Sequence, residues 1–341
     1  MVTDTNGLSQ SENSQSNSIL RQKFQTLRNQ LNAKILGQNH LVDRLLIALL
    51  SDGHLIVEGA PGLAKTRAIK TLAEMIDGEF HRIQFTPDLL PSDLTGTDIY
   101  QPEKANFVFQ KGPLFNNIVL ADEINRAPAK VQSALLEAMA ERQITIGKTS
   151  HNLPELYMVM ATQNPIEQEG TYPLPEAQLD RFLLHVFVDY PSNEVEGQIM
   201  SLAREEALNL SSVDTSSQAL VTVSEMEVKQ ARKEVLNLHL SPVLQEYIVQ
   251  LILASRNPGK YNSQVERWID YGASPRGSIS LERTARAHAW LTGRDFVTPD
   301  DIQNMIHDTL RHRIILSFTA EAEGIDSNQV INRLLDLVPV P

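Results

Sequence analysis

The chain has 341 residues and a mass of 38.1 kDa, which is enough for two domains of ordinary size. Its 42 Asp and Glu residues outnumber its 30 Lys and Arg residues. The resulting net charge of −12 disfavours a nucleic-acid partner, because non-specific binding to phosphates depends on cationic side chains. The absence of cysteine excludes disulfides, zinc–thiolate sites, iron–sulfur clusters and cysteine nucleophiles.

The start of the chain predicts a cytoplasmic protein with a disordered tail. Residues 1–18 are rich in Ser, Asn and Gln, and such a segment cannot bury enough apolar surface to offset the entropy lost on ordering. The tail lacks the basic start and the apolar stretch of a signal peptide. No apolar run approaches the ~20 residues that a transmembrane helix needs, so no transmembrane segment is expected.

Short apolar runs alternate with helical patterns between residues 19 and 205. Runs that are apolar throughout are typical of strands that are buried on both faces of a parallel sheet. The predicted strands are 54–57, 80–85, 118–121, 156–162 and 182–188, and the helical patterns cover 19–50, 66–76 and 128–142. This alternation predicts an α/β domain with a parallel sheet.

The rest of the chain predicts a second domain that is all-helical. A Ser/Thr-rich segment at 206–224 loses the sheet pattern and is interpreted as a linker. Residues 225–341 then show helical periodicity almost throughout. The expected helix starts, from capping residues and first-turn prolines, are Ser241-Pro242, Thr298-Pro299 and Ser327.

A glycine-rich loop joins the first predicted strand to the next helix and indicates a phosphate-binding site. The loop reads Gly59-Ala60-Pro61-Gly62-Leu63-Ala64-Lys65-Thr66. Glycines let backbone N–H groups converge on phosphates, the helix N-terminus adds positive potential, the lysine reaches the terminal phosphates and the threonine coordinates Mg²⁺. The general pattern has glycine where this chain has Ala64, so the loop alone also fits an ordinary turn before a helix.

Two acidic residues after the third predicted strand complete this expectation. Asp122 ends a buried strand, where its carboxylate can hold hydrated Mg²⁺ bound through Thr66. Glu123 can orient and polarise the attacking water. Asn164 follows the fourth predicted strand and can hydrogen-bond the γ-phosphate or that water, although Asn-Pro by itself is a turn signal. The pattern predicts an enzyme that hydrolyses ATP with the help of Mg²⁺.

These motifs resemble the signature stretches of the MoxR family of AAA+ ATPases. The matching stretches are Gly59–Thr66, Asp122–Pro128, Ala161–Pro165, Glu176–Phe182, Gly272–Arg276 and Gly293–Ile302. They occur in the family's order over about residues 20–337, and alanine is common in this family at the position of Ala64. The resemblance implies a P-loop AAA+ parallel-sheet domain followed by a small all-helical lid domain.

The resemblance also implies roles for individual residues. Gln38 matches the segment that contacts the nucleotide base, and Asn164 matches the sensor-1 position. Arg181 matches the arginine finger, which reaches the nucleotide of the neighbouring subunit. Arg276 matches sensor 2, which is expected to reach the nucleotide of its own subunit. Arg126 is a second basic residue near the subunit boundary and ranks lower. The nucleotide-binding loop comprises Gly59, Ala60, Pro61, Gly62, Leu63, Ala64, Lys65 and Thr66.

The same resemblance implies partners for the protein and a role for two inserted segments. It implies a ring-shaped homo-oligomer, expected to be a hexamer, that remodels or matures a client protein, often one with a von Willebrand factor A domain. Segments 97–110 and 144–149 match insertions of the family and also fit ordinary surface hairpins, and 257–271 is expected to be a long loop. Three alternatives stay open: a nucleotide sensor without turnover, a motor subunit of a metal-chelatase-like complex, and a DNA-remodelling motor.

Overall fold

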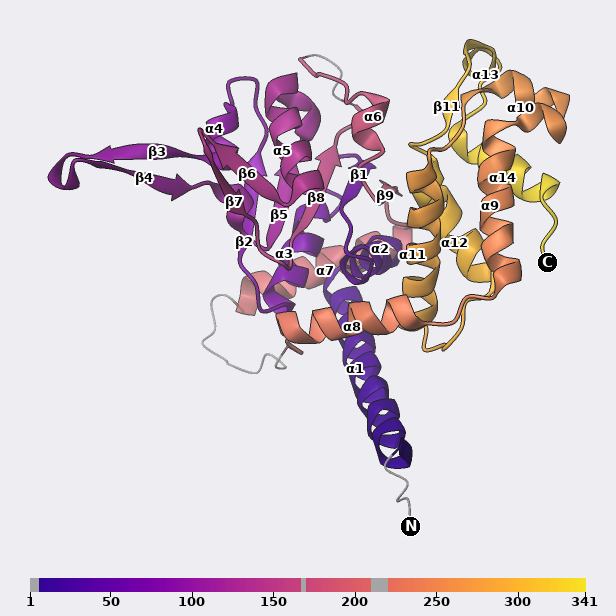
Figure 1. Cartoon of the computed structure of the whole chain (residues 1–341), viewed down its shortest axis with the longest axis horizontal. Coiled ribbons are helices and arrows are strands. Elements are labelled where there is room, and N and C mark those ends of the chain that lie inside the picture. Colours follow the sequence, from indigo (N-terminus) through magenta and orange to yellow (C-terminus); the bar gives the residue numbers. More distant parts are fainter. Residues whose placement is uncertain (1–5, 167–169, 210–219) are drawn as a thin grey trace.

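A parallel five-stranded sheet forms the centre of the N-terminal domain, as predicted (Figure 1). The computed structural model describes residues 6–166, 170–209 and 220–341. The strands lie in the order β2–β5–β8–β1–β9, and every neighbouring pair is parallel. Their bounds are β1 Leu55–Gly59, β2 Phe80–Gln84, β5 Ile118–Asp122, β8 Met158–Gln163 and β9 Leu184–Val188. All five predicted strands are confirmed.

Both faces of the sheet are buried along its inner strands, which explains why β1, β5 and β8 read as nearly continuous apolar runs. Successive side chains of a strand point to opposite faces. In β5, Ile118 and Leu120 therefore join one hydrophobic cluster, whereas Val119 and Ala121 join the other. A strand that alternated apolar and polar residues would leave one of these clusters incomplete.

Helices cover the two faces of the sheet unequally. On one face pack α4 (Pro91–Thr95) and α5 (Ala129–Glu141), and on the other pack α1 (Asn6–Lys34), α2 (Asn39–Leu50) and α3 (Lys65–Met75). The composition predicts disorder through residue 18, but the helical backbone of α1 already begins at Asn6, and residues 1–5 lie outside the described part. Two further helices, α6 (Glu176–Leu179) and α7 (Asn193–Asn209), flank β9 in the chain.

The two expected insertions are β-hairpins. Strands β3 (Gly96–Gln101) and β4 (Asn106–Lys111) form a two-stranded ribbon that projects away from the body of the molecule (Figure 1). Strands β6 (Gln143–Ile146) and β7 (Thr149–Asn152) form a shorter one. Gly96 has φ +88°, and a Cβ atom there would lie 2.2 Å from the Gln110 carbonyl oxygen, so the base of the longer hairpin requires glycine.

Short 3₁₀ turns occupy Pro102–Lys104, Pro113–Phe115 and Ile124–Arg126.

The C-terminal domain is helical apart from one short two-stranded ladder. Its helices are α8 Glu225–Asn237, α9 Pro242–Arg256, α10 Ser263–Trp268, α11 Pro275–Leu291, α12 Pro299–Leu310, α13 Phe318–Ala322 and α14 Ser327–Leu337, and its ladder joins β10 Ile269–Tyr271 to β11 Ile315–Leu316. None of the helices in the described residues is both long and apolar enough to cross a membrane.

Three details of this domain differ from expectation or refine it. The segment 257–271 is not a long loop, because it forms a 3₁₀ turn at Pro258–Lys260, then α10 and β10. Asp326, not Ser327, caps α14, since its carboxylate accepts a hydrogen bond from the Gln329 N–H. The expected caps Ser241 and Thr298 are confirmed.

The expected linker is only partly described. Helix α7 extends to Asn209, and residues 210–219 lie outside the described part of the chain. The end of the linker is attached to the sheet domain, because Val223 exchanges backbone hydrogen bonds with Met75 and Asp77. Ser224 then caps α8.

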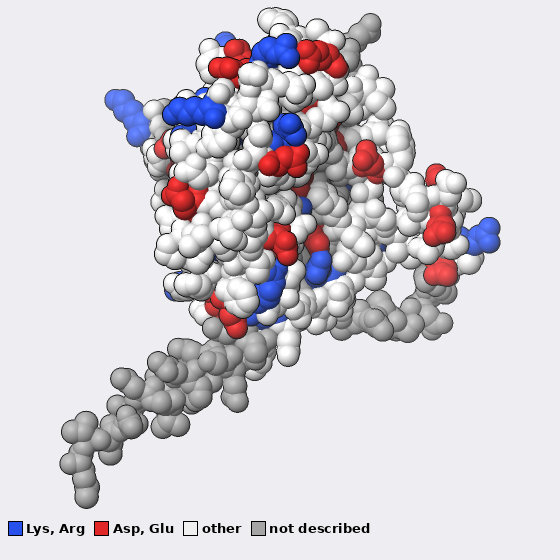
Figure 2. All heavy atoms as spheres, turned by 90° about the vertical axis from the view of Figure 1, so that its right-hand side faces the viewer, with Lys and Arg blue, Asp and Glu red and all other residues white. Residues whose placement is uncertain are grey.

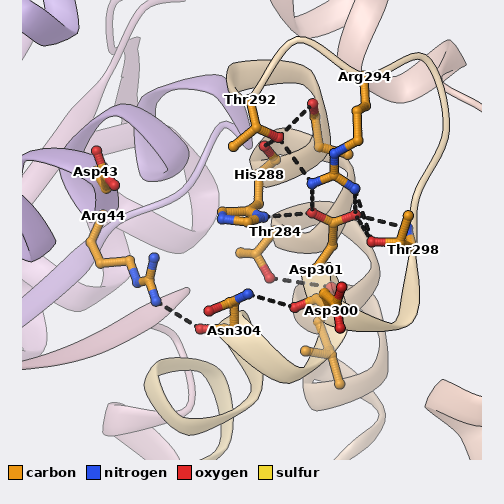
Figure 3. A network of polar contacts seen from close by, with 12 residues as sticks. Asp43, Arg44, Thr284, His288, Thr292, Arg294, Thr298, Asp300, Asp301 and Asn304 are labelled. Atoms are coloured by element: carbon orange, nitrogen blue, oxygen red, sulfur yellow. Dashed lines mark hydrogen bonds and ion pairs between the residues drawn. The ribbon is translucent and has the colours of Figure 1, made fainter. Parts of the chain in front are cut away.

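The lid packs on the sheet domain through one continuous core and a buried ion-pair cluster. Leu46 of α2, Leu281 of α11 and Ile302 of α12 belong to the same hydrophobic cluster. Arg44 of α2 binds the buried Asp308 of α12, with 2.5 Å between Nε and Oδ2. Arg44 also donates to the backbone oxygen of Asn304, as Figure 3 shows. On the lid side of the molecule, charged side chains of both signs are interspersed (Figure 2).

A second buried carboxylate organises the turn between α11 and α12 (Figure 3). Asp301 is fully buried and binds His288 Nδ1 at 2.6 Å, both terminal nitrogens of Arg294, and the backbone and hydroxyl of Thr298. Burial opposes ionisation of Asp301, but the hydrogen bonds from His288, Arg294 and Thr298 outweigh it and lower its pKa to about 2.

We expect Asp301→Asn to lower the free energy of unfolding by about 3 kcal/mol, because it leaves Arg294 facing a neutral partner in a buried site. Since the folded-state pKa of Asp301 lies below its unfolded value, this stabilisation is present above about pH 4 and is lost as the pH falls toward 2. Denaturant titration measures the change. Asp300→Asn, at the exposed neighbouring carboxylate, is the control and should cost less than about 1 kcal/mol. Equal losses in the two variants would contradict the assigned role.

Candidate functional site

The glycine-rich loop begins at the carboxyl end of β1 and has a backbone that few side chains tolerate. Gly62 has φ +84° with open space around it, and Ala64 has φ +56°, in the left-handed region, immediately before α3. A Cβ atom at Gly59 would lie only 2.6 Å from the Val188 carbonyl oxygen of β9, so this position requires glycine. Left-handed residues before a helix turn successive N–H groups toward one point, which is the geometry of an anion-binding loop.

Lys65 points into a cavity of about 380 Å³ beside this loop. Its ammonium group donates to the Gly59 carbonyl oxygen at 2.6 Å and lies 3.5 Å from the Gln163 carbonyl oxygen. Burial lowers the pKa of Lys65, although the carboxylates of Asp122 and Glu123 oppose this effect. A phosphate in the cavity would add a further negative charge beside the buried amine. The cavity is lined by Pro61, Gly62, Leu63, Ala64, Lys65, Thr66, Arg67, Arg82, Asp122, Glu123, Thr162, Gln163 and Asn164.

Asp122 lies at the carboxyl end of β5 with both carboxylate oxygens engaged. Oδ1 accepts a hydrogen bond from the Thr162 hydroxyl at 2.6 Å. Oδ2 accepts from Arg82 Nε at 3.0 Å and from Arg82 Nη2 at 2.6 Å. Sequence reasoning missed both partners. Thr162 lies in β8, whose apolar sequence predicts a buried strand but no polar contact. Arg82 is an exposed residue of β2, a strand in which polar and apolar residues are mixed.

Glu123 is the next residue after Asp122 and has a left-handed conformation, with φ +56°. Its N–H donates to the Thr162 hydroxyl oxygen at 2.9 Å, so this hydroxyl links both acidic residues. Glu123 Oε2 accepts from Gln84 Nε2 at 2.7 Å and from Arg126 Nη1 at 3.0 Å. Arg126 therefore contacts the carboxylate expected to polarise water, in the same subunit, and Gln84 is a further site residue that the sequence did not reveal.

The predicted sensor residue and the predicted base contact lie at the same edge of the sheet. Asn164 is buried in the cavity wall after β8, and its Oδ1 accepts from the Ile166 N–H at 3.2 Å. Gln38 does not line the cavity, but its Nε2 donates to the carbonyl oxygen of Asp189, the residue after β9. Because β9 and β1 are parallel neighbours, Gln38 lies beside the start of the loop.

The two predicted arginines lie at the opposite end of the sheet. The Leu183 N–H donates to the His54 carbonyl oxygen, so Arg181 lies before the amino ends of β1 and β9. The glycine-rich loop lies beyond their carboxyl ends, a separation of roughly 15 Å along a five-residue strand. Arg181 is exposed, and its Nη1 donates to the Leu136 carbonyl oxygen of α5 at 2.6 Å.

Arg276 lies with Arg181 and not with Lys65. Its side chain is 56% exposed, and its Nη1 lies 3.6 Å from Asp180 Oδ2, in the wall of a cavity of about 320 Å³ that Arg181 also lines. This cavity has a net positive lining, because Asp52 and Asp180 face five arginines. Those five are Arg142, Arg181, Arg276, Arg283 and Arg313. Arg276 therefore does not line the cavity that contains Lys65 of its own subunit.

Comparison with known proteins decides which family this arrangement belongs to. The family model of the ATPases associated with various cellular activities (AAA) matches residues 54–184, and the model of the AAA lid domain matches 262–334. Chaperone MoxR1 of Mycobacterium tuberculosis is 46% identical over 308 residues, which are 90% of this chain and 79% of the relative. The chain belongs to the MoxR family of AAA+ ATPases.

Two further relatives agree with this membership. Protein MoxR of Paracoccus denitrificans is 32% identical over 306 residues, covering 86% of this chain and 89% of the relative. A solved structure of a Cytophaga hutchinsonii protein, proposed to be an ATPase, superposes with a TM-score of 0.89 at 45% identity. The superposition covers 98% of this chain and 100% of that chain. This MoxR-family fold thus extends over both domains.

The residues around Lys65 fit a nucleotide with Mg²⁺. Within the described residues, no group of three or more His, Asp or Glu side chains is arranged to hold a metal ion alone. Mg²⁺ is commonly bound by one or two protein groups together with substrate phosphates, and Thr66 and Asp122 line the same cavity. The buried amine of Lys65 and the loop with left-handed residues at Gly62 and Ala64 have the charge and geometry that suit the phosphates of such a nucleotide.

Two substitutions should separate binding from chemistry in this cavity. Lys65→Ala removes the buried positive charge, so the affinity for ATP should fall at least about tenfold. Glu123→Gln keeps the shape and the hydrogen bonds to Gln84 and Arg126, so ATP should bind within about threefold of the wild-type affinity while hydrolysis falls at least about a hundredfold. Equilibrium binding of a fluorescent ATP analogue and phosphate release measure the two effects. A Glu123→Gln protein with the wild-type rate would refute the role of Glu123.

Proposed function

We propose that this MoxR-family ATPase hydrolyses ATP to ADP and phosphate in a magnesium-dependent reaction and uses the energy to remodel or mature a client protein. The observation that carries the proposal is the cavity that combines an anion-binding loop, the buried Lys65 and the adjacent carboxylates Asp122 and Glu123. Similarity to a relative named a chaperone supports the remodelling role.

The residues of the cavity divide the work of the reaction. Lys65 and the loop N–H groups bind the terminal phosphates, and Asn164 positions the γ-phosphate or the attacking water. Glu123 orients the water and accepts its proton as the bond to phosphorus forms. Mg²⁺, held through Thr66 and Asp122, would neutralise charge on the phosphates. Gln38, near the loop, is proposed to contact the base.

Arg181 and Arg276 are proposed to act on the nucleotide of a neighbouring subunit. Both lie at the amino end of the sheet, whereas the cavity of their own subunit lies at the carboxyl end. An arginine that reaches the γ-phosphate stabilises the charge of the transition state and is worth ~10³–10⁵ in rate in finger-type enzymes. The net positive lining around these two residues favours an anionic partner.

This division implies a ring in which each site is shared by two subunits, and we propose a hexamer. The client, proposed to contain a von Willebrand factor A domain, would contact the hairpins. Tyr100 and Phe107 are 51% and 63% exposed on the β3–β4 ribbon, and at its base Phe109 stacks on His151 of β7 with 4.1 Å between ring centroids. The two hairpins are therefore in contact with each other.

The charge of the chain argues against a nucleic-acid substrate. The net charge is −12, and Lys and Arg side chains on the lid side form no continuous surface among the described residues (Figure 2). Affinity for the phosphate backbone depends on such a surface. A chelatase-like motor shares the proposed chemistry and differs in the client, so capture of the client separates it from a remodelling ATPase.

A mixing experiment tests completion of the site between subunits. Arg181→Ala and Lys65→Ala should each lose at least about a hundredfold in ATPase rate, for different reasons. Mixed under conditions of subunit exchange, some interfaces pair an intact Lys65 with an intact Arg181, so phosphate release should recover to roughly a quarter of the wild-type rate in an equimolar mixture.

The matched control is a mixture of Arg181→Ala with an Arg181→Ala, Lys65→Ala double variant, which contains no such interface and should stay inactive. No recovery in rings shown to contain both single variants would mean that Arg181 acts within its own subunit or has no catalytic role. Arg126, which contacts Glu123, would then be the next candidate.

A further inference from the structure

Arg82 is a charged residue of the nucleotide cavity to which the proposed reaction assigns no role. It lies on β2, the edge strand of the sheet, and its side chain is 50% exposed. The Asp122 side chain that it binds is only 13% exposed. The forked contact, at 3.0 and 2.6 Å, joins the guanidinium to one carboxylate oxygen.

This contact occupies two of the roughly four acceptor positions of the carboxylate that is proposed to hold a hydrated metal ion. A carboxylate oxygen accepts about two hydrogen bonds, and Oδ2 of Asp122 already accepts two from Arg82. Oδ1 accepts one from the Thr162 hydroxyl. A divalent cation and a guanidinium also repel each other at this short range. The Arg82–Asp122 pair and a metal ion on Asp122 are therefore competing arrangements.

We propose that Arg82 is a positioning residue that occupies Asp122 in the nucleotide-free protein and is displaced when Mg²⁺ and nucleotide bind. The inference rests on the proposed magnesium-dependent function of this cavity. The half-exposed guanidinium can leave Asp122 without crossing the core, whereas the buried Asp122 stays in place.

Displacement of Arg82 also reaches Glu123. Arg82 Nη2 donates to Gln84 Oε1 at 3.0 Å, which turns the amide nitrogen of Gln84 toward Glu123 Oε2, at 2.7 Å. Without Arg82, the orientation of the Gln84 amide is less restricted, because its two ends have nearly the same shape. Release of Asp122 by Arg82 thus loosens the hydrogen bond that holds the water-polarising carboxylate.

The test is the Mg²⁺ concentration that gives half-maximal binding of a fluorescent ADP analogue to the full-length protein. Arg82→Met removes the competing cation, so this concentration should fall by about two- to five-fold, the range that a half-exposed ion pair supports. Arg82→Lys keeps the charge and loses the forked contact, so its value should lie between those of the methionine variant and the wild type.

Lys70→Met is the matched control, because it removes one exposed positive charge from α3 outside the cavity lining and should leave the Mg²⁺ requirement unchanged. An unchanged requirement in Arg82→Met would overturn the inference. A higher requirement would overturn it as well, because Arg82 would then assist binding. If neither the wild type nor Lys70→Met binds the analogue with Mg²⁺, the proposed function itself fails, which is a different result.

Discussion

The polarity of the parallel sheet is the constraint on which the rest of this structure depends. Every strand ends at the same edge, so the loop after β1, the carboxylates after β5 and the amide after β8 converge there. The same polarity carries Arg181 to the other edge, before β9. One subunit therefore presents the cavity around Lys65 at one end of its sheet and an arginine-rich cavity at the other, which suits a head-to-tail assembly.

The lid keeps these two cavities in a fixed relation. Its helices share a hydrophobic cluster with the sheet domain, and Asp308 binds Arg44 of α2 across the boundary. Arg313 of the lid binds Asp180, next to Arg181, at 2.8 Å. Asp180 also lies 3.6 Å from Arg276, so one carboxylate joins two lid arginines to the segment that carries Arg181. These contacts connect the lid to the arginine-rich cavity.

Much of this architecture could be predicted from local sequence, and the limits have physical causes. The strands could be predicted because burial on both faces of the sheet restricts their residues to apolar types. The glycine-rich loop could be predicted because phosphate binding restricts the residue types over a short stretch. Arg82, Thr162 and Gln84 were missed because their roles arise from pairing between strands distant in the sequence. The position of Arg276 depends on how the lid packs, which no local pattern specifies. The segment 257–271 looked like a loop because its ordered elements are only three to six residues long.

The central claim is that the hydrolytic site is incomplete in a single subunit. It is tested most directly by measuring the ATPase rate per subunit over a dilution series, with the association state followed in parallel by sedimentation. We predict a rate per subunit that rises with concentration as subunits associate and reaches a plateau when assembly is complete. A rate per subunit that stays at its plateau value in samples shown to be monomeric would contradict the claim.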